Sequence, residues 1–79
     1  LLGGQMRTVE LTREPVELYK ILKFEGMVAS GGEAKMVISE GLVLVNGKVE
    51  TRKRKKIVAG DNIEFGQEIF RIECAEKKD

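Results

Sequence analysis

The sequence predicts an α+β fold in which two packed helices lie against a small antiparallel β-sheet. In the first half of the chain, two segments carry apolar residues at the three- and four-residue spacing of a helix, and a glycine follows each segment. After the second of these glycines, Gly41, the pattern changes to short apolar runs and alternation, which are typical of strands. The 79 residues suffice for one domain with a small core.

The first strand and the first helix are expected before Gly26, whose position marks the end of that helix. Residues 7–11 alternate between apolar and polar side chains, which favours a short strand. Thr12 then opens a helix with Pro15 in its first turn, where the missing N–H costs no hydrogen bond. Charged residues that suit the dipole of this helix are Glu14, Glu17, Lys20 and Lys23. Its core-facing residues are Leu18, Ile21 and Leu22.

The second helix begins at a capping box. Ser30 and Glu33 stand three residues apart, so that each side chain can accept a hydrogen bond from the backbone N–H of the other residue. The connection between the two helices is short, which predicts that they pack as a tight hairpin or corner. The apolar stripe of the second helix consists of Ala34, Val37 and Ile38.

Strands and turns occupy the second half of the chain. Asn46-Gly47 is the strongest short-range signal for a type I′ hairpin. Strands are expected at residues 42–45, 48–51, 62–65 and 68–74, with turns at 59–61 and 66–67. A single domain should span residues 6–75, with flexible ends at residues 1–5 and 76–79.

The charge is concentrated in one stretch. Residues 48–56 hold six basic side chains and one acidic one, whereas the other seventy residues hold eight basic and twelve acidic ones. A basic run is often only a solvated surface, but this one is contiguous and directly follows a tight turn. A concentrated cationic loop on an otherwise acidic small domain is typical of a phosphate-binding surface. The sequence therefore predicts a nucleic-acid-binding module.

Catalysis is poorly supported. The chain has no histidine, and its carboxylates form no obvious pair, so neither an enzyme active site, a metal site nor a cofactor is expected. A lone cysteine, Cys74, excludes an internal disulfide and fits a reducing, cytoplasmic setting. No apolar run approaches the ~20 residues that cross a membrane.

The aromatic residues bear on how a nucleic acid would be bound. Only Tyr19, Phe24, Phe65 and Phe70 are present, and at least the last two follow strand patterns that should place them in the core. Without a stacking platform, recognition through backbone shape and phosphates is favoured over recognition of unstacked bases.

The order of these motifs resembles the alpha-L RNA-binding domain, the small domain named after ribosomal protein S-four. The residues that carry the resemblance are the capped helix with Ala34-Lys35 and Ile38, then Gly41, Val43, Val45-Asn46-Gly47-Lys48-Val49 and Val58-Ala59-Gly60-Asp61. Within this family the chain is most similar to the stand-alone bacterial YbcJ-type proteins. That similarity lies in Lys23-Phe24-Glu25-Gly26, Glu40-Gly41, Val49-Glu50-Thr51-Arg52-Lys53-Arg54 and Lys56-Ile57-Val58-Ala59-Gly60.

The resemblance implies RNA binding in a groove between the second helix and the loop carried by the sheet. Two departures remove positive charge from the helical wall. Many larger members begin the first helix with Arg-Leu-Asp, where this chain has Glu17-Leu18-Tyr19, and place an arginine where this chain has Gly31. Binding should therefore depend more on the basic loop than in those relatives.

We expect a non-catalytic protein that binds structured RNA through its phosphate backbone. The predicted RNA-binding residues are Lys20, Lys23, Ser30, Gly31, Gly32, Lys35, Asn46, Lys48, Arg52, Lys53, Arg54, Lys55 and Lys56. The glycines at the helix start fit a plain cap as well as a phosphate site, and Lys20 and Lys23 fit the helix dipole without any ligand.

Two alternatives stay open. One is a protein-interaction module that uses the basic loop and the sheet edge of its C-terminal β region. The other is an accessory domain of an RNA-modifying enzyme on another chain. An rRNA-like or tRNA-like target, ribosome association and a monomeric state are compatible with the leading prediction.

Overall fold

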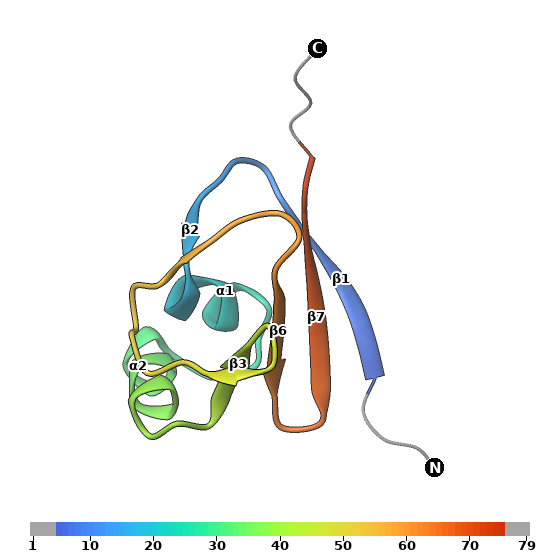
Figure 1. The fold of residues 1–79 in the computed structure, drawn as a ribbon. Helices are drawn as coiled ribbons and strands as arrows, with labels where there is room; N and C mark the ends of the chain where they lie inside the picture. Colours follow the sequence, from blue (N-terminus) through green and yellow to red (C-terminus); the bar gives the residue numbers. More distant parts are fainter. Residues whose placement is uncertain (1–4, 76–79) are drawn as a thin grey trace.

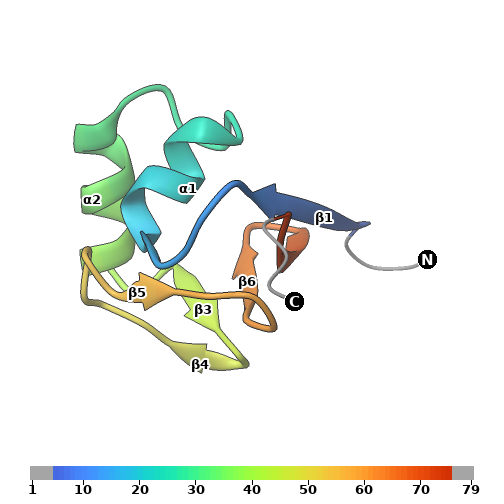
Figure 2. The same cartoon turned by 90° about the horizontal axis from the view of Figure 1, so that it is seen from above.

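A five-stranded sheet with both helices packed on one face organises the structure (Figures 1 and 2). The computed structural model describes residues 5–75. Along the chain the elements are β1 (Gln5–Leu11), β2 (Val16–Glu17), α1 (Leu18–Phe24), α2 (Gly31–Ser39), β3 (Val43–Val45), β4 (Lys48–Val49), β5 (Lys56–Ile57), β6 (Asn62–Phe65) and β7 (Glu68–Cys74). The α+β class predicted from the sequence is confirmed.

The strand order is β1-β7-β6-β3-β4, and β2 and β5 form a separate two-stranded sheet. Every pair in the larger sheet is antiparallel except β1 with β7, which run parallel. The sheet is therefore mostly antiparallel, as predicted, with one parallel pair at its edge. Both helices and strands β2 to β6 lie in the connection from β1 to β7. Parallel neighbours require such a long crossover.

The position of β7 also corrects the predicted interaction edge. Because β7 lies between β6 and β1, the C-terminal strand has no free edge. The edges of the larger sheet are β1 and β4 instead.

The helical core stripes are confirmed. All six predicted helical residues are buried, and they join strand residues in one cluster. The strand and loop members of that cluster are Val9, Leu11, Val28, Val43, Val45, Ile57, Ile63, Phe70 and Ile72. Phe70 is fully buried and Phe65 partly so, as predicted, whereas Phe24 is 69% exposed.

The predicted start of the first helix is wrong. Thr12 and Pro15 precede the helix, and α1 begins only at Leu18, after β2. The reason is that the segment before Leu18 pairs with a strand far along the chain. Strand β2 pairs with β5 through Val16 opposite Ile57, and the Leu18 N–H donates to the Lys55 carbonyl at 2.9 Å. These bonds hold the backbone before Leu18 in an extended conformation.

The predicted dipole partners at that start are corrected in the same way. The first turn of α1 contains no acidic residue, and Glu17 is the N-cap residue but makes no capping hydrogen bond. The Glu14 carboxylate accepts instead from the Ala59 N–H at 2.7 Å. At the other end the prediction holds for Lys23, which lies in the last turn, but not for Lys20.

The capping box of α2 is confirmed with one shift. The Glu33 N–H donates to the Ser30 hydroxyl at 3.1 Å, as expected. The Glu33 carboxylate reaches one residue further and accepts from the Ala29 N–H at 2.8 Å. Both helices end where glycine was expected to end them, with Gly26 and Gly41 just beyond the last turn at φ 74° and 80°.

The Asn46-Gly47 turn has the primed geometry that was predicted. Both residues have positive φ, 54° for Asn46 and 84° for Gly47. Strand β4 after the turn is shorter than expected and ends at Val49. The Asn46 side chain also ties the turn to the next hairpin, because its amide donates to the Asp61 carboxylate at 3.0 Å and its oxygen accepts from the Asn62 N–H at 2.9 Å.

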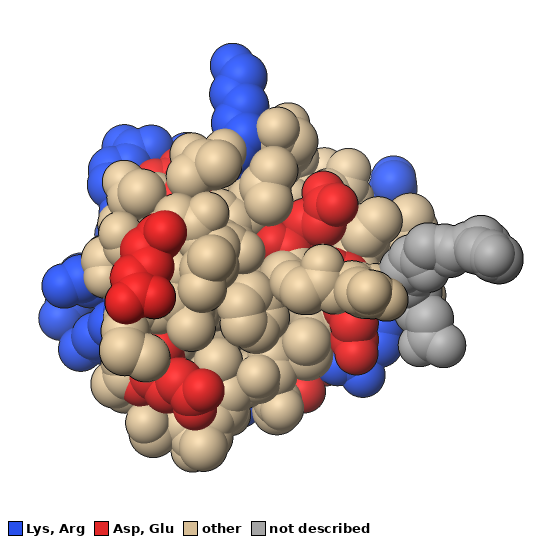
Figure 3. All heavy atoms as spheres, turned by 90° about the horizontal axis from the view of Figure 1, so that it is seen from below, with Lys and Arg blue, Asp and Glu red and all other residues tan. Residues whose placement is uncertain are grey.

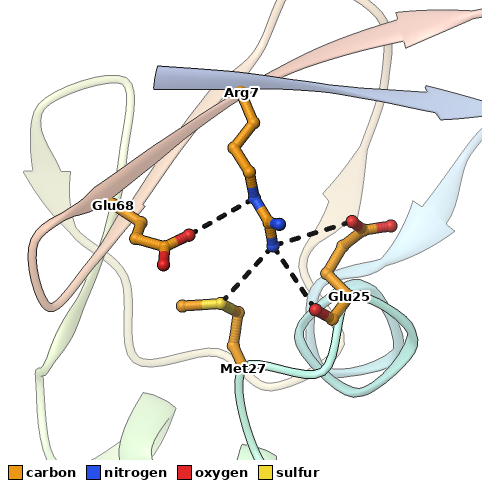
Figure 4. Close-up of polar contacts among 4 residues, drawn as sticks. All are labelled: Arg7, Glu25, Met27 and Glu68. Atoms are coloured by element: carbon orange, nitrogen blue, oxygen red, sulfur yellow. Dashed lines mark hydrogen bonds and ion pairs between the residues drawn. The ribbon is translucent and has the colours of Figure 1, made fainter. Parts of the chain in front are cut away.

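Arg7 connects strand β1 to the end of α1 (Figure 4). Its guanidinium contacts the Glu68 carboxylate at 3.3 Å and donates to the Glu25 carbonyl at 3.4 Å. It also lies near the Met27 sulfur and 5.0 Å from the centre of the Phe70 ring. Arg7 therefore covers the part of the core between the edge strand and the helix.

The predicted flexible ends fall mostly outside the described residues, which exclude 1–4 and 76–79. Gln5, which the sequence assigned to the first of these ends, is the first residue of β1. Among residues 5–75, neither helix is long and apolar enough to span a bilayer.

The turn geometry gives a stability prediction with a matched control. Gly47→Ala should lower the free energy of unfolding by about 1–2 kcal/mol, because a side chain is disfavoured at positive φ. A Cβ at Gly47 would meet no atom within 4 Å, so the cost is conformational rather than steric. Gly32→Ala, in the helical backbone of α2, should instead raise that free energy by about 0.5–1 kcal/mol. Urea unfolding of both variants measures the two effects, and equal effects of the same sign would contradict the assigned turn.

Candidate nucleic-acid interface

The predicted cations lie on three parts of the chain. Lys20 and Lys23 lie on α1 and Lys35 lies on α2. Lys48 is the first residue of β4, Lys56 is the first residue of β5, and the loop between these strands holds Arg52, Lys53, Arg54 and Lys55. Seen from below, the surface facing the viewer carries carboxylates and uncharged side chains, while basic side chains project at several places around the outline of the molecule (Figure 3).

The basic loop, residues 50–55, is attached to the start of α1. The Leu18 N–H donates to the Lys55 carbonyl at 2.9 Å, and the Tyr19 N–H donates to the Lys53 carbonyl at 3.2 Å. These carbonyls satisfy N–H groups that a helix start leaves without an internal partner. The loop therefore has a defined backbone path beside the helix.

A residue that the sequence analysis did not assign to the site, Tyr19, lies at its centre. Its ring centre is 4.7 Å from the Lys35 ammonium, 5.6 Å from the Arg54 guanidinium and 6.0 Å from the Lys20 ammonium. The three cations come from α2, the loop and α1, and attraction to the ring face stabilises each approach. No spacing rule could have found this cluster, because Lys35 and Arg54 are distant from Tyr19 in sequence.

Two carboxylates lie among these cations. Glu17 contacts the Lys20 ammonium at 3.8 Å and the Arg54 guanidinium at 3.9 Å. Glu50 makes a closer pair with Arg52, which donates from Nε at 2.9 Å and from a terminal nitrogen at 3.3 Å. The Arg52 backbone N–H also donates to Glu50, at 3.0 Å.

The Glu50–Arg52 contact shifts the pKa values of both side chains. Hydrogen bonding from the Arg52 side chain holds the pKa of the Glu50 carboxyl below its usual value of 4.5. The same contact raises the pKa of Arg52. The Glu50 side chain is only 12% exposed, whereas that of Arg52 is 72% exposed, so the pair presents its cation to solvent.

The other predicted cations have no ion-pair partner among the residues that the structure describes. Among residues 5–75, no carboxylate lies within 4.0 Å of the ammonium groups of Lys23, Lys35, Lys48, Lys53, Lys55 or Lys56. A shallow depression is lined by Arg52, Arg54, Lys55 and Lys56. Such a concave group of cations suits an anionic ligand.

The start of α2 lies beside Tyr19. A Cβ at Gly31 would meet the Tyr19 ring and the Lys23 side chain at 4.0 Å each. The Ser30 hydroxyl is occupied by the Glu33 N–H, so it serves the helix cap. Asn46 is likewise engaged within the protein, and its amide and its carbonyl oxygen both serve the hairpin.

A larger groove, of about 590 Å³, borders this region between residues 9–17 and α1. It shares Lys20 and Lys56 with the predicted site and includes the exposed Phe24. Neither the groove nor an exposed aromatic side chain was predicted from the sequence. In the described part of the chain, no three Cys, Asp or Glu residues are grouped so that they could hold a metal ion.

Comparison with known proteins agrees with this architecture. The S4 domain family matches residues 9–73. The chain belongs to the S4 domain family. The resemblance drawn from the sequence is thereby confirmed.

Two relatives and one solved structure are similar to most of the chain. "Putative RNA-binding protein YbcJ" of Escherichia coli K12 is 54% identical over 61 residues, which cover 76% of this chain and 87% of that protein. "Probable ribosome maturation protein RlbA" of Bacillus subtilis is 36% identical over 57 residues, covering 72% and 80%. The solution structure of Escherichia coli YbcJ, described as having an alpha-L motif involved in RNA-binding, matches with a TM-score of 0.65 and 48% identity over 84% of this chain and 85% of that one.

The Glu50–Arg52 contact predicts a pH dependence. In the folded protein the pKa of Glu50 lies below 4.5, so the Glu50 carboxylate binds a proton more readily in the unfolded chain. The contact therefore stabilises the fold above pH 4.5, and this contribution is lost as the pH falls through the lowered pKa. Glu50→Gln lacks this contribution, so the two proteins should differ in free energy of unfolding at pH 7 and converge in acid. Urea unfolding from about pH 7 to about pH 3 measures the difference, and a gap that widens in acid would contradict the assignment.

Proposed function

We propose that this chain is a non-catalytic RNA-binding protein that holds structured RNA through its phosphate backbone. The observation that carries the proposal is the basic loop, whose backbone is held against α1 and whose cations adjoin those of the two helices. Cations at defined positions suit the regular phosphates of a folded RNA. The family membership and the description of the YbcJ structure support RNA as the ligand.

The parts of the site have different roles in this proposal. The loop cations, Lys35 and the exposed Lys48 neutralise phosphates, and arginine can bind a phosphate through two hydrogen bonds. The N–H groups of Gly31 and Gly32, at the start of α2, are suitably placed to face a phosphate. Ser30 and Asn46 act indirectly, since their side chains hold the helix start and the hairpin in place. Lys20 and Lys23 complete the helical wall.

The ribosome is one setting in which this activity would be used. The name of the Bacillus subtilis relative connects that protein to ribosome maturation. We propose structured RNA, of ribosomal or tRNA-like form, as the ligand class of this chain, and a cytoplasmic monomer as its working state.

The central test is a change in salt dependence. Replacing Arg52, Lys53 and Arg54 together with Gln removes three charges from exposed side chains. Each lost phosphate contact should flatten the plot of log affinity against log salt by about 0.7–0.9, so the slope should change by about 2–3. Filter binding to hairpin RNA at several salt concentrations measures the slope.

A matched control uses cations outside the interface. Arg13→Gln with Arg71→Gln removes two charges from exposed side chains and should change the slope by well under about 1. Arg7 is unsuitable as a control, because it contacts Glu68, Glu25 and Phe70. If the control and the loop variant flatten the slope in proportion to the charge removed, binding is diffuse and the proposed interface is wrong.

The proposal also predicts a ligand preference. At about 0.15 M salt, where long-range charge effects are screened beyond about 8 Å, hairpin RNA should bind more tightly than single-stranded RNA or duplex DNA of equal length. The reason is that fixed cations fit a fixed A-form backbone better than a flexible strand or B-form duplex. Equal affinity for all three would refute recognition of RNA shape. In cell extract, a partner that stays bound after ribonuclease treatment would indicate a protein-interaction module instead.

A further inference from the structure

The candidate interface contains two acidic residues that a simple phosphate-binding surface would lack. Glu17 and Glu50 lie among its cations, and their side chains are 24% and 12% exposed. A carboxylate near a phosphate site repels the ligand, so each one lowers the affinity for a polyanion. We therefore expect Glu17 and Glu50 to have an effect that offsets this loss of affinity.

We propose that Glu17 and Glu50 are specificity-determining residues, which hold neighbouring cations in fixed positions so that the interface selects RNA with a rigid, matching backbone over flexible polyanions. This inference rests on the proposed function. It concerns which residues create the preference for structured RNA, whereas the proposed function concerns whether and where such RNA is bound.

Glu50 fixes the direction of Arg52. Two guanidinium nitrogens of Arg52 donate to its two carboxylate oxygens at 2.9 and 3.3 Å, and the Arg52 N–H anchors the same carboxylate at 3.0 Å. Arginine has five N–H donors, so donors remain for a phosphate on the open side. With 72% of its side chain exposed, Arg52 is oriented by Glu50 without being covered by it.

Glu17 acts on a second group of cations. It lies 3.9 Å from Arg54 and 3.8 Å from Lys20, and both cations also approach the Tyr19 ring. The ring attracts Lys35 as well, at 4.7 Å. Glu17 and Tyr19 together therefore gather cations from α1, α2 and the loop at one place.

Cations held in fixed positions change the relative affinity of the interface for folded RNA and for flexible polymers. Ordering a long side chain on binding costs conformational entropy, and this cost is reduced when the side chain is already held in position. A folded RNA with matching phosphates gains from this arrangement. A flexible polymer adapts to any arrangement of charges, so for it the carboxylates are only repulsive. Discrimination arises from this difference.

The test removes one negative charge at a time and measures two ligands. Glu17→Gln and Glu50→Gln are compared with wild type for binding to a panel of hairpin RNAs and to poly-uridine of the same length. The amide oxygen of a glutamine at position 50 can still accept from the Arg52 N–H. Glu73→Gln serves as the matched control, because Glu73 also pairs with an arginine, Arg71 at 3.8 Å, on a strand separated from β4 by β6 and β3.

Poly-uridine should bind each interface variant about two- to fivefold more tightly, the size of one exposed charge interaction. The best-bound hairpin should bind equally or less tightly despite the added positive charge, so the ratio of the two affinities falls. The ratio should stay constant for Glu73→Gln. In an Arg52→Gln background, Glu50→Gln should no longer lower the hairpin affinity, since the cation that it positions is gone.

Two results would overturn the inference. One is equal tightening of both ligands by the interface variants, which would mean that the carboxylates only dilute the positive charge. The other is a loss of hairpin affinity from Glu50→Gln that is as large in the Arg52→Gln background as in wild type, which would mean that Glu50 does not act through Arg52. Either result leaves the proposed function standing if the loop variant still loses its salt dependence. Thermal unfolding checks the fold of each variant, and Glu17→Gln tests the inference independently should Glu50→Gln fail to fold.

Discussion

The start of α1 depends on two carbonyl groups that belong to the basic loop. Glu17 gives this helix no side-chain cap, so the N–H groups of Leu18 and Tyr19 are satisfied by the carbonyls of Lys55 and Lys53. Leu18 is also fully buried, which links the same turn to the core. An exposed, highly charged loop is thereby fixed by the same bonds that complete a core helix. The loop cannot move freely without leaving helix N–H groups unpaired, which is costly where water has limited access.

The charged surface is organised by contacts that contribute little to stability. Ion pairs at the surface are worth about 0–1 kcal/mol each, and the pairs around Glu17 and Glu50 lie at the surface with their cations exposed. Their effect is geometric, because they limit the directions in which arginine and lysine side chains point. The Tyr19 ring adds a third contact of the same character. Together these contacts convert a run of basic residues into charges at defined positions.

Local signals in the sequence predicted the parts of the fold that depend on neighbouring residues. The Ser30–Glu33 cap and the Asn46-Gly47 turn were correct, because a few adjacent residues determine each of them. The predicted start of α1 was wrong, because the backbone there pairs with residues 53–57 and no local sequence pattern indicates that pairing. The cations of the candidate site were visible as a run of charge. Their arrangement around Tyr19 was not, since it requires three distant segments to be placed together.

The parallel pairing of β1 with β7 has a consequence for how the chain reaches this fold. Strand β1 is made first and has only β7 as a neighbour in the sheet, so it stays without a partner until β7 has been synthesised. On a translating ribosome the hairpins and helices can form as they emerge, whereas the edge strand must wait. Contacts between residues so far apart in sequence are slow to form, because the loop-closure entropy is lost before they are made. Arg7 belongs to this late strand, so its contacts with the end of α1 are also among the last to form, and a nascent chain carries an incomplete sheet until β7 has been synthesised.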